Sequence, residues 1–237
     1  MNTKIFYGIE FKVYSETKIE GDFIKENEAV YFENDVEITG NLKVKYLKTK
    51  ESIKVSGSYE VEKFDEVGKW QKVDKWQEVG EWQKVGGSQE VGGSQEVGKW
   101  QKVDKWQKVG GSQEVGGSQE VDEWQKVGGS QEVGKWQEVG GSQEVGGNLI
   151  AESSKVSLFS IVKGKYEVAG KVFIGVCEWR KTDESEETLT CGKFISGEIK
   201  YGKLKEIGLD DKPQEINFSG KEIEIKIDGK NYKAIIK

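Results

Sequence analysis

Valine returns every six residues, without a miss, from Val61 to Val145. Side chains of a β-strand alternate between its two faces, and six is an even number. All of these valines can therefore face the same side, provided that the corners between strands preserve the alternation of side chains between the two faces. A helix would need apolar residues at steps of three and four, and the stretch has none. The short fixed period therefore predicts a repeat architecture made of β-strands.

Corner residues follow each valine. Gly68, Asp74, Gly80 and the Gly86-Gly87 pair come directly after a valine, and residues of these types favour turns. Three hexads would make one triangular coil of about eighteen residues, as in β-helices built from hexapeptides. Coils of this kind stack about 4.8 Å apart, so the valines would form one continuous buried stripe. The sequence predicts an all-β protein, a single-stranded parallel β-solenoid with about three hexads per coil.

An antiparallel meander is the alternative arrangement. Its strands would resemble Trp70-Gln-Lys-Val73, joined by two-residue turns such as Asp74-Lys75. Across such a turn Val73 would share a face with Trp76, and Val79 would fall on the opposite face. The valines would then be divided between two surfaces, so the solenoid is favoured.

Glutamine occupies the fifth position of each hexad from Gln71 to Gln143 and has the same parity as valine. These amides should therefore point inward or lie at the corners. Burying an amide without a hydrogen-bond partner costs free energy. A stacked ladder, in which each amide bonds to the one above, would satisfy them.

The flanks carry a looser form of the repeat. Gly21, Gly40 and Gly57 each lie two residues after an aliphatic residue and are nineteen and seventeen residues apart, close to one coil. Ile223–Ile227 and Tyr232–Ile235 alternate on either side of Asp228-Gly229, which predicts a hairpin that caps the open end. We expect N-terminal coils and a cap in residues 1–60, the hexapeptide solenoid in 61–148, and C-terminal coils with the hairpin in 149–237.

Three flanking segments carry a family resemblance. They are Ile38-Thr-Gly40-Asn-Leu42, Val55-Ser-Gly57-Ser-Tyr59 and Ile195-Ser-Gly197-Glu-Ile199. This aliphatic-x-Gly-x-aliphatic pattern resembles bactofilins, the β-helical cytoskeletal proteins that form polymers. It covers roughly half of the chain and does not extend to the Trp-Gln hexads. The resemblance implies a right-handed triangular β-helix that polymerises end to end without nucleotide.

Residues for catalysis are scarce. The chain has no histidine, which excludes a histidine base and serine or cysteine nucleophiles paired with histidine. Cys177 and Cys191 without histidine make a poor zinc site, and we expect two thiols. The acidic residues between them, from Asp183 to Glu187, are interpreted as a solvated loop. We therefore expect no catalytic, cofactor-binding or metal-binding residues, and a protein that is not an enzyme.

Tryptophan takes the fourth position of about half of the hexads, and serine takes it in the others. Its parity is opposite to that of valine, so the rings should lie outside. There they could stack on sugars or drive lateral association. Alternatively, each ring lies along the sheet and covers neighbouring side chains. The two hexad versions follow no regular order, and we expect no sorting onto separate faces. The candidate interaction residues are Trp70, Trp76, Trp82, Trp100, Trp106, Trp124 and Trp136.

Charge and hydropathy bear on partners. The net charge is −6 with acids and bases interleaved, so nucleic acid is not an expected partner. No segment has the apolar run of a secretory signal or a membrane span, which favours a cytoplasmic location. We expect Met1–Phe11 to form a first strand that caps the solenoid. The alternative, which is not favoured, is an interfacial membrane anchor through Ile5, Phe6, Tyr7, Ile9 and Phe11.

Two functions follow from these expectations. The first is a structural protein, a rigid solenoid that serves as a scaffold or as the subunit of a cytoskeletal-like filament. It would assemble with further copies of itself by end-to-end or lateral contact. The second is a surface adhesin-like or carbohydrate-binding solenoid, in which the exposed tryptophans bind a polysaccharide.

Overall fold

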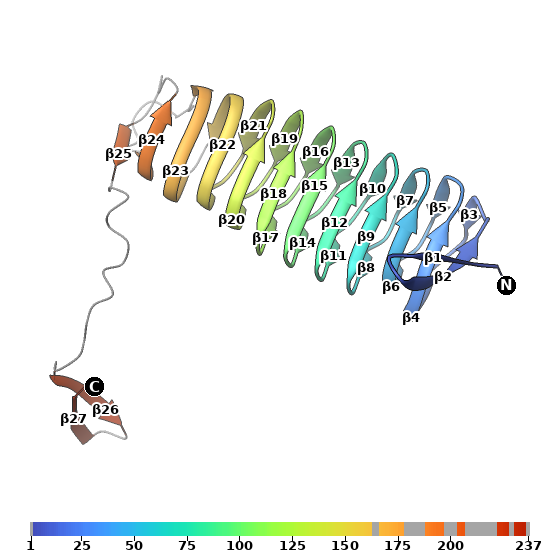
Figure 1. Ribbon diagram of the computed structural model, residues 1–237, viewed down its shortest axis with the longest axis horizontal. Helices are drawn as coiled ribbons and strands as arrows, with labels where there is room; N and C mark the ends of the chain where they lie inside the picture. The colour runs from blue at the N-terminus through green and yellow to red at the C-terminus, as the bar shows by residue number, and fades with distance from the viewer. Residues whose placement is uncertain are drawn as a thin grey trace.

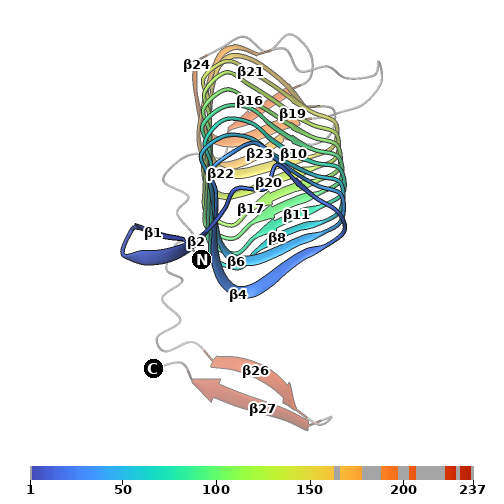
Figure 2. The same ribbon diagram turned by 90° about the vertical axis from the view of Figure 1, so that its right-hand side faces the viewer.

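A computed structural model describes residues 2–162, 166–177, 188–196, 203–206, 222–227 and 230–235. Their regular secondary structure consists of β-strands alone, which confirms the predicted all-β class. Figure 1 shows the strands wound into an elongated coil. Figure 2, turned by 90°, shows the outlines of successive coils nested behind one another. The chain therefore folds as a stack of flat turns, as the hexad period predicts.

The N-terminal coils contain short strands joined by glycine corners. Gly40 N–H donates to the Gly21 carbonyl at 3.0 Å, and Gly57 N–H donates to the Gly40 carbonyl at 2.9 Å. The glycine spacing does mark one coil in this part of the chain. The strands are β1 (Thr3–Phe6), β2 (Ile9–Tyr14), β3 (Lys18–Ile19), β4 (Phe23–Phe32), β5 (Val36–Ile38), β6 (Leu42–Thr49), β7 (Ile53–Val55), β8 (Tyr59–Val61) and β9 (Phe64–Val67).

Each hexad forms one short strand that ends at a valine, except that two successive hexads join in the longer β20. Strands three hexads apart pair in parallel, with Gln71 opposite Gln89 and Val73 opposite Val91, so one coil is eighteen residues long. The antiparallel meander is therefore wrong. The strands are β10 (Gln71–Val73), β11 (Gln77–Val79), β12 (Trp82–Val85), β13 (Gln89–Val91), β14 (Gln95–Val97), β15 (Trp100–Val103), β16 (Trp106–Val109), β17 (Gln113–Val115), β18 (Ser118–Val121), β19 (Trp124–Val127), β20 (Gln131–Val139) and β21 (Ser142–Val145).

The coil has three faces, which we name by their glutamine columns. Face 1 carries the column that begins with Gln71 and contains β10, β13, β16, β19 and β21. Face 2 carries the Gln77 column, on β11, β14 and β17. Face 3 carries the Gln83 column, on β12, β15 and β18. The longer β20 runs from face 2 into face 3, with a shift of register between Val133 and Trp136.

The parallel pairing continues beyond the hexads through β22 (Leu149–Val162), β23 (Tyr166–Cys177), β24 (Thr188–Ser196) and β25 (Lys203–Glu206). Cys177 is in register with Ser160 on face 1, whereas Cys191 is in register with Val168 on face 2. The side chains of both cysteines and the acidic segment 182–187 lie outside the described residues.

The predicted C-terminal hairpin is confirmed. Strands β26 (Glu222–Ile227) and β27 (Lys230–Ile235) pair antiparallel, with Ile227 opposite Lys230. They form a two-stranded sheet of their own. Within the described residues, the hairpin therefore does not extend the solenoid sheet by strand pairing.

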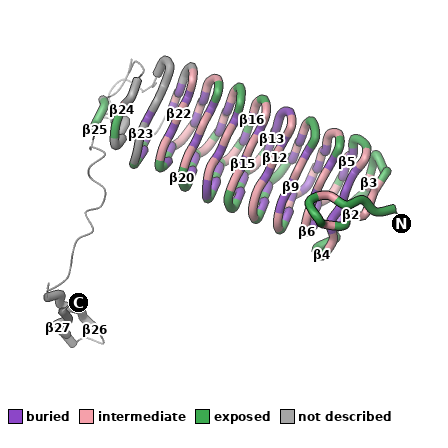
Figure 3. The backbone as a smooth tube through the Cα atoms, in the orientation of Figure 1, coloured by how far each residue is buried: buried purple, intermediate pink, exposed green. Residues whose placement is uncertain are grey.

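The hydrophobic core is a narrow stripe inside the coil. Each hexad valine from Val61 to Val145 is at most 1% exposed, and buried residues recur on every coil of the hexad region in Figure 3. The stripe belongs to one cluster that extends from Phe23 to Val172. Burial of a side chain such as valine contributes about 1.5–3 kcal/mol, so a thin core accumulates stability with each coil.

The N-terminal hairpin of β1 and β2 packs against the solenoid. Its turn, Tyr7-Gly8, has positive φ at both residues (55° and 76°), a conformation that favours a tight hairpin turn. The expected single first strand over Met1–Phe11 is instead a hairpin, in which β1 pairs antiparallel with β2. Phe11 is fully buried in an aromatic cluster with Tyr31 and Phe64.

The candidate anchor residues are thus divided. Phe11 belongs to the core of the hairpin, and Phe6 packs against the same cluster, whereas Ile5 and Tyr7 are exposed. In the part of the chain that the structure describes, no helix is long and apolar enough to cross a membrane.

Candidate functional site: the amide core and the outer faces

The glutamines form a network of hydrogen bonds inside the coil. The Nε2 of Gln107 donates to Oε1 of Gln89, one coil earlier, at 2.8 Å and to Oε1 of Gln95, on the neighbouring face, at 2.9 Å. All hexad glutamines are at most 2% exposed. The predicted stacked ladder is confirmed. The bonds between faces, which the sequence pattern did not predict, join the three columns into one network.

The network has one direction. From Gln77 to Gln143, the amide hydrogen bonds run from Nε2 to the oxygen of a glutamine or aspartate earlier in the chain. An amide has two donor hydrogens and a carbonyl with two lone pairs, so two bonds given and two accepted satisfy it. A one-way network leaves unmatched donors at its first end and unmatched acceptors at its last.

Asp65 accepts hydrogen bonds from the donors at the first end of the network. Its Oδ2 accepts hydrogen bonds from Nε2 of Gln71 at 2.8 Å and of Gln83 at 2.9 Å. Its Oδ1 accepts from the hydroxyl of Tyr59 at 2.7 Å. An ionised carboxylate is a pure acceptor, so Asp65 has the chemistry that this end requires.

Hydroxyl groups donate hydrogen bonds to the acceptors at the last end of the network. Ser154 Oγ donates to Oε1 of Gln137, and Ser160 Oγ donates to Oε1 of Gln143, each at 3.3 Å. The hydroxyl of Tyr166 lies 2.9 Å from Ser154 Oγ. The ladder therefore ends on groups that match its direction, and buried amides are not left without partners there.

Burial shifts the ionisation of the first cap. Desolvation raises the pKa of Asp65 to about 6, although hydrogen bonds from Tyr59, Gln83 and Gln71 oppose the shift. The pKa of Tyr59 is raised well above its usual value by burial and by the adjacent Asp65 charge. A perturbed buried carboxylate often marks a functional site. Here its partners indicate a structural role, the start of the amide network.

The candidate tryptophans do not form one surface. Face 1 carries Trp70, Trp106 and Trp124, and face 2 carries Trp76. Face 3 carries Trp82, Trp100 and Trp136. Trp76 is 41% exposed, whereas the other six are half-buried. The structure thus brings together at most two of these rings in adjacent coils of a face.

Several aromatic rings pack on one another. The ring of Trp82 stacks on Phe64, with centroids 4.8 Å apart, and Trp100 meets Trp82 edge to face at 6.2 Å. Trp106 and Trp124 form a similar edge-to-face pair at 6.5 Å. Rings tilted in this way cover their neighbours and do not present coplanar platforms for sugars. The geometry favours the interpretation in which the rings cover the sheet.

The hexad versions do sort on face 2, so the expectation of no sorting is wrong for that face. From Gly92 onward, every third hexad reads Gly-Gly-Ser-Gln-Glu-Val, which places Ser94, Ser112 and Ser130 in one row. The row is joined by backbone N–H groups that donate to the serine hydroxyls of the preceding coil. The order is irregular along the sequence because faces 1 and 3 vary, whereas face 2 carries serine in each coil from Ser94 to Ser130.

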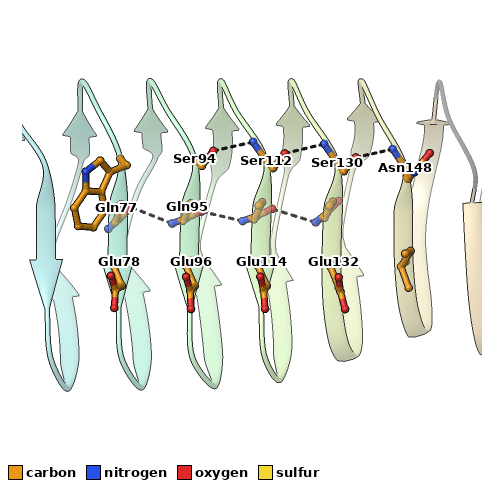
Figure 4. Close-up of a pocket in the computed structure, with 14 residues that line it drawn as sticks. Gln77, Glu78, Ser94, Gln95, Glu96, Ser112, Glu114, Ser130, Glu132 and Asn148 are labelled. Atoms are coloured by element: carbon orange, nitrogen blue, oxygen red, sulfur yellow. Dashed lines mark hydrogen bonds between the residues drawn. The ribbon is translucent and has the colours of Figure 1, made fainter.

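A groove runs along face 2 beside the serine row (Figure 4). It has a volume of about 350 Å³, and its lining includes Trp76, from the first of its coils, and Ile150, from the last. Glu78, Glu96, Glu114 and Glu132 form a row along it, one per coil, and point the same way in Figure 4. The charged residues that line the groove are thus all acidic.

The charges on the other faces neutralise one another. On face 3, Lys102 pairs with Glu120 at 2.5 Å, and on face 1, Lys126 pairs with Glu144 at 2.9 Å. Among the described residues, no lysine pairs with the four glutamates of the face 2 groove. Like charges on adjacent strands repel. The pKa of Glu78 is raised, by burial first and then by the charges of Glu96 and Glu60.

In the described ranges, no group of three or more histidine, cysteine, aspartate or glutamate side chains is arranged to hold a metal ion. Comparisons of the chain with known protein families, with curated proteins and with solved structures found no match. The fold and its surfaces place the chain in the structural class of parallel β-solenoids with an internal glutamine ladder.

Proposed function

We propose that the chain is a non-enzymatic structural protein, a rigid β-solenoid rod that acts as a scaffold or as the subunit of a filament in the cytoplasm. One observation carries the proposal. The amide network runs without interruption from Asp65 to Ser160, and the valine stripe accompanies it. Each coil of a solenoid contacts only its neighbours, so stiffness depends on the contacts between successive coils.

Bending the rod would open those contacts on one side. Each coil of the hexad region is held to the next by three parallel strand pairings and by amide bonds inside. Because the amide bonds also cross between faces, opening one column disturbs the other two. The resemblance of the flanks to bactofilins supports polymerisation without nucleotide.

The proposal is tested on the purified full-length chain by small-angle scattering and electron microscopy over a range of concentrations. Rods that lengthen into filaments as concentration rises, equally with and without ATP or GTP, are the expected result. Discrete monomeric rods at high concentration would reject the filament and leave the scaffold. A compact or expanded particle in place of a rod would reject both.

A carbohydrate-binding or adhesin-like solenoid is a second candidate. A mainly apolar hollow between Trp82 and Trp100, flanked by Lys84 and Lys99, favours it. This function predicts that a polysaccharide quenches tryptophan fluorescence and that Trp100→Ala abolishes the effect. An unchanged spectrum across a broad panel of glycans would exclude it.

A further inference from the structure

Face 2 and face 3 carry complementary charges. The groove of face 2 presents four unpaired glutamates, Glu78 to Glu132. On face 3, the lysines beside the tryptophans outnumber the acids. Lys63 and Lys99 share Glu81, at 3.3 and 3.5 Å, and Lys84 forms no ion pair with any described residue. The Trp82–Trp100 patch, defined as Trp82, Lys84, Lys99 and Trp100, is therefore basic and partly apolar.

The spacing of the glutamate row indicates what can occupy the groove. The row advances by one coil per charge, or about 4.8 Å. Side chains on one side of an extended peptide repeat at roughly 6.7 Å, and the turns of an α-helix repeat at about 5.4 Å. Both would lose register with the row within a few charges. A second copy of this chain has the same axial repeat, so residues of face 3 that are one coil apart, such as Lys84 and Lys102, keep the spacing of the row.

We propose that rods associate side by side, with the face 2 groove of one copy docked on the Trp82–Trp100 patch of a second copy. The inference rests on the proposed rod function and names the partner of its lateral contact. Glu96 and Glu114 of one rod lie against the patch that carries Lys84 and Lys99 on the other. Trp76, exposed in the same groove, adds apolar surface next to the aromatic patch.

This contact joins two different surfaces, so each added rod leaves one groove and one patch free. Such heterologous contacts produce open assemblies and not closed dimers. The patch spans two coils, which at about 4.8 Å per coil and a strand width of about 13 Å gives roughly 125 Å² per partner. This area is well below that of stable specific interfaces, so a single contact should be weak. Because charges dominate it, association should be strong at low ionic strength and lost near 1 M salt.

The test uses charge reversal in the full-length chain. One variant carries Glu96→Lys and Glu114→Lys, which makes the groove basic. The other carries Lys84→Glu and Lys99→Glu, which makes the patch acidic. We expect wild type to associate laterally in 20 mM NaCl by analytical ultracentrifugation, and each variant alone to sediment as single rods. An equimolar mixture of the two variants should regain association, since opposite charges then face each other in both contacts.

A matched control reverses two carboxylates of face 1, Glu90→Lys and Glu144→Lys, with the same change in net charge as the groove variant. It should associate as wild type does, and small-angle scattering should show that all variants keep the rod shape. Loss of association in this control, or its retention in either groove or patch variant, would overturn the proposal. If wild-type rods stay single but bind polylysine, the groove binds a basic partner and not a second copy of the chain. Rods that never pair reject only the lateral contact, whereas the absence of rods rejects the proposed function.

Discussion

Gln83 Nε2 donates a hydrogen bond of 2.9 Å to the carboxylate of Asp65, one coil earlier in the stack. Asp65 occupies the position in its hexad that glutamine takes in all later ones. Replacing an amide by a carboxylate removes the donor that would have nothing to bond to at the start of the ladder. This one residue therefore sets where the network begins.

The protonation of Asp65 should make stability depend on pH. Burial raises the pKa of Asp65 from 3.8 to about 6 in the folded chain. Between these values the folded chain holds a proton that the unfolded chain has released. The free energy of unfolding should therefore fall as pH rises from about 4 to 6, by up to about 3 kcal/mol from this residue.

The measurement is urea unfolding of wild type and Asp65→Asn at several values between pH 4 and pH 7. The difference between the two chains isolates Asp65 from the surface carboxylates. Several of those have lowered pKa values, as Glu81 does, and they change stability in the opposite direction at lower pH. Parallel curves for the two chains would show that Asp65 is already ionised throughout this range.

A break in the middle of the ladder should be costly. In Gln107→Leu, Gln119 and Gln125 each lose one acceptor, because both donate to Gln107 Oε1. Each unmet buried donor costs about 1–3 kcal/mol, so we expect a loss of roughly 2–6 kcal/mol in the free energy of unfolding. The neighbouring Lys108→Leu, which changes an outward residue in the same strand, should cost less than about 0.5 kcal/mol. Equal effects from the two substitutions would mean that the amides do not stabilise the rod.

Coil number should be adjustable in units of eighteen residues. Deletion of residues 92–109 removes three hexads, or one coil, and brings together strands of the same register and face. We expect a folded rod shorter by about 4.8 Å, seen as unchanged circular dichroism per residue and a smaller maximum dimension in scattering. Deletion of residues 92–106 removes an odd number of residues. The side chains after the deletion would then point to the opposite side of their strands. A shorter chain that unfolds at the same denaturant concentration in both cases would disprove the coil length.

The N-terminal hairpin should contribute to folding stability. Phe11 is fully buried against the aromatic cluster outside face 3, whereas Ile5 is 74% exposed. Phe11→Ala should therefore cost about 3–5 kcal/mol, as a buried phenylalanine does, and Ile5→Ala less than about 0.5 kcal/mol. Thermal unfolding followed by circular dichroism compares the two. If Phe11→Ala keeps the wild-type midpoint but loses binding to lipid vesicles, the segment is an anchor and not part of the fold.

Much of the interior could be predicted because it follows from parity. Val73 and Gln71 are two residues apart in a strand, so they must share a side, and a valine side must be buried. The bonds between faces could not be predicted in the same way. The bond from Gln107 to Gln95 depends on how close two columns come inside the coil, which no spacing in the sequence encodes.

The exterior was harder to predict. The order of Trp and Ser hexads becomes regular on face 2 only when the chain is divided into coils of eighteen residues with the correct starting point. The flanks contain coils of other lengths, such as the nineteen residues from Gly21 to Gly40, which obscures that starting point. The packing of Tyr7 on Phe64 joins the turn of the N-terminal hairpin to a coil strand far along the chain, which no local sequence pattern indicates.

The amides of the ladder donate toward residues that the ribosome has already made. When a new coil emerges, its donors find acceptors fixed in the coil before it, beginning at Asp65. Growth from the first coil thus requires no residue that has not yet been synthesised, whereas growth from the last coil would have to wait for Ser154 and Ser160, which cap the ladder there. The ladder can therefore form in the same order, from the N-terminus to the C-terminus, in which the chain is synthesised.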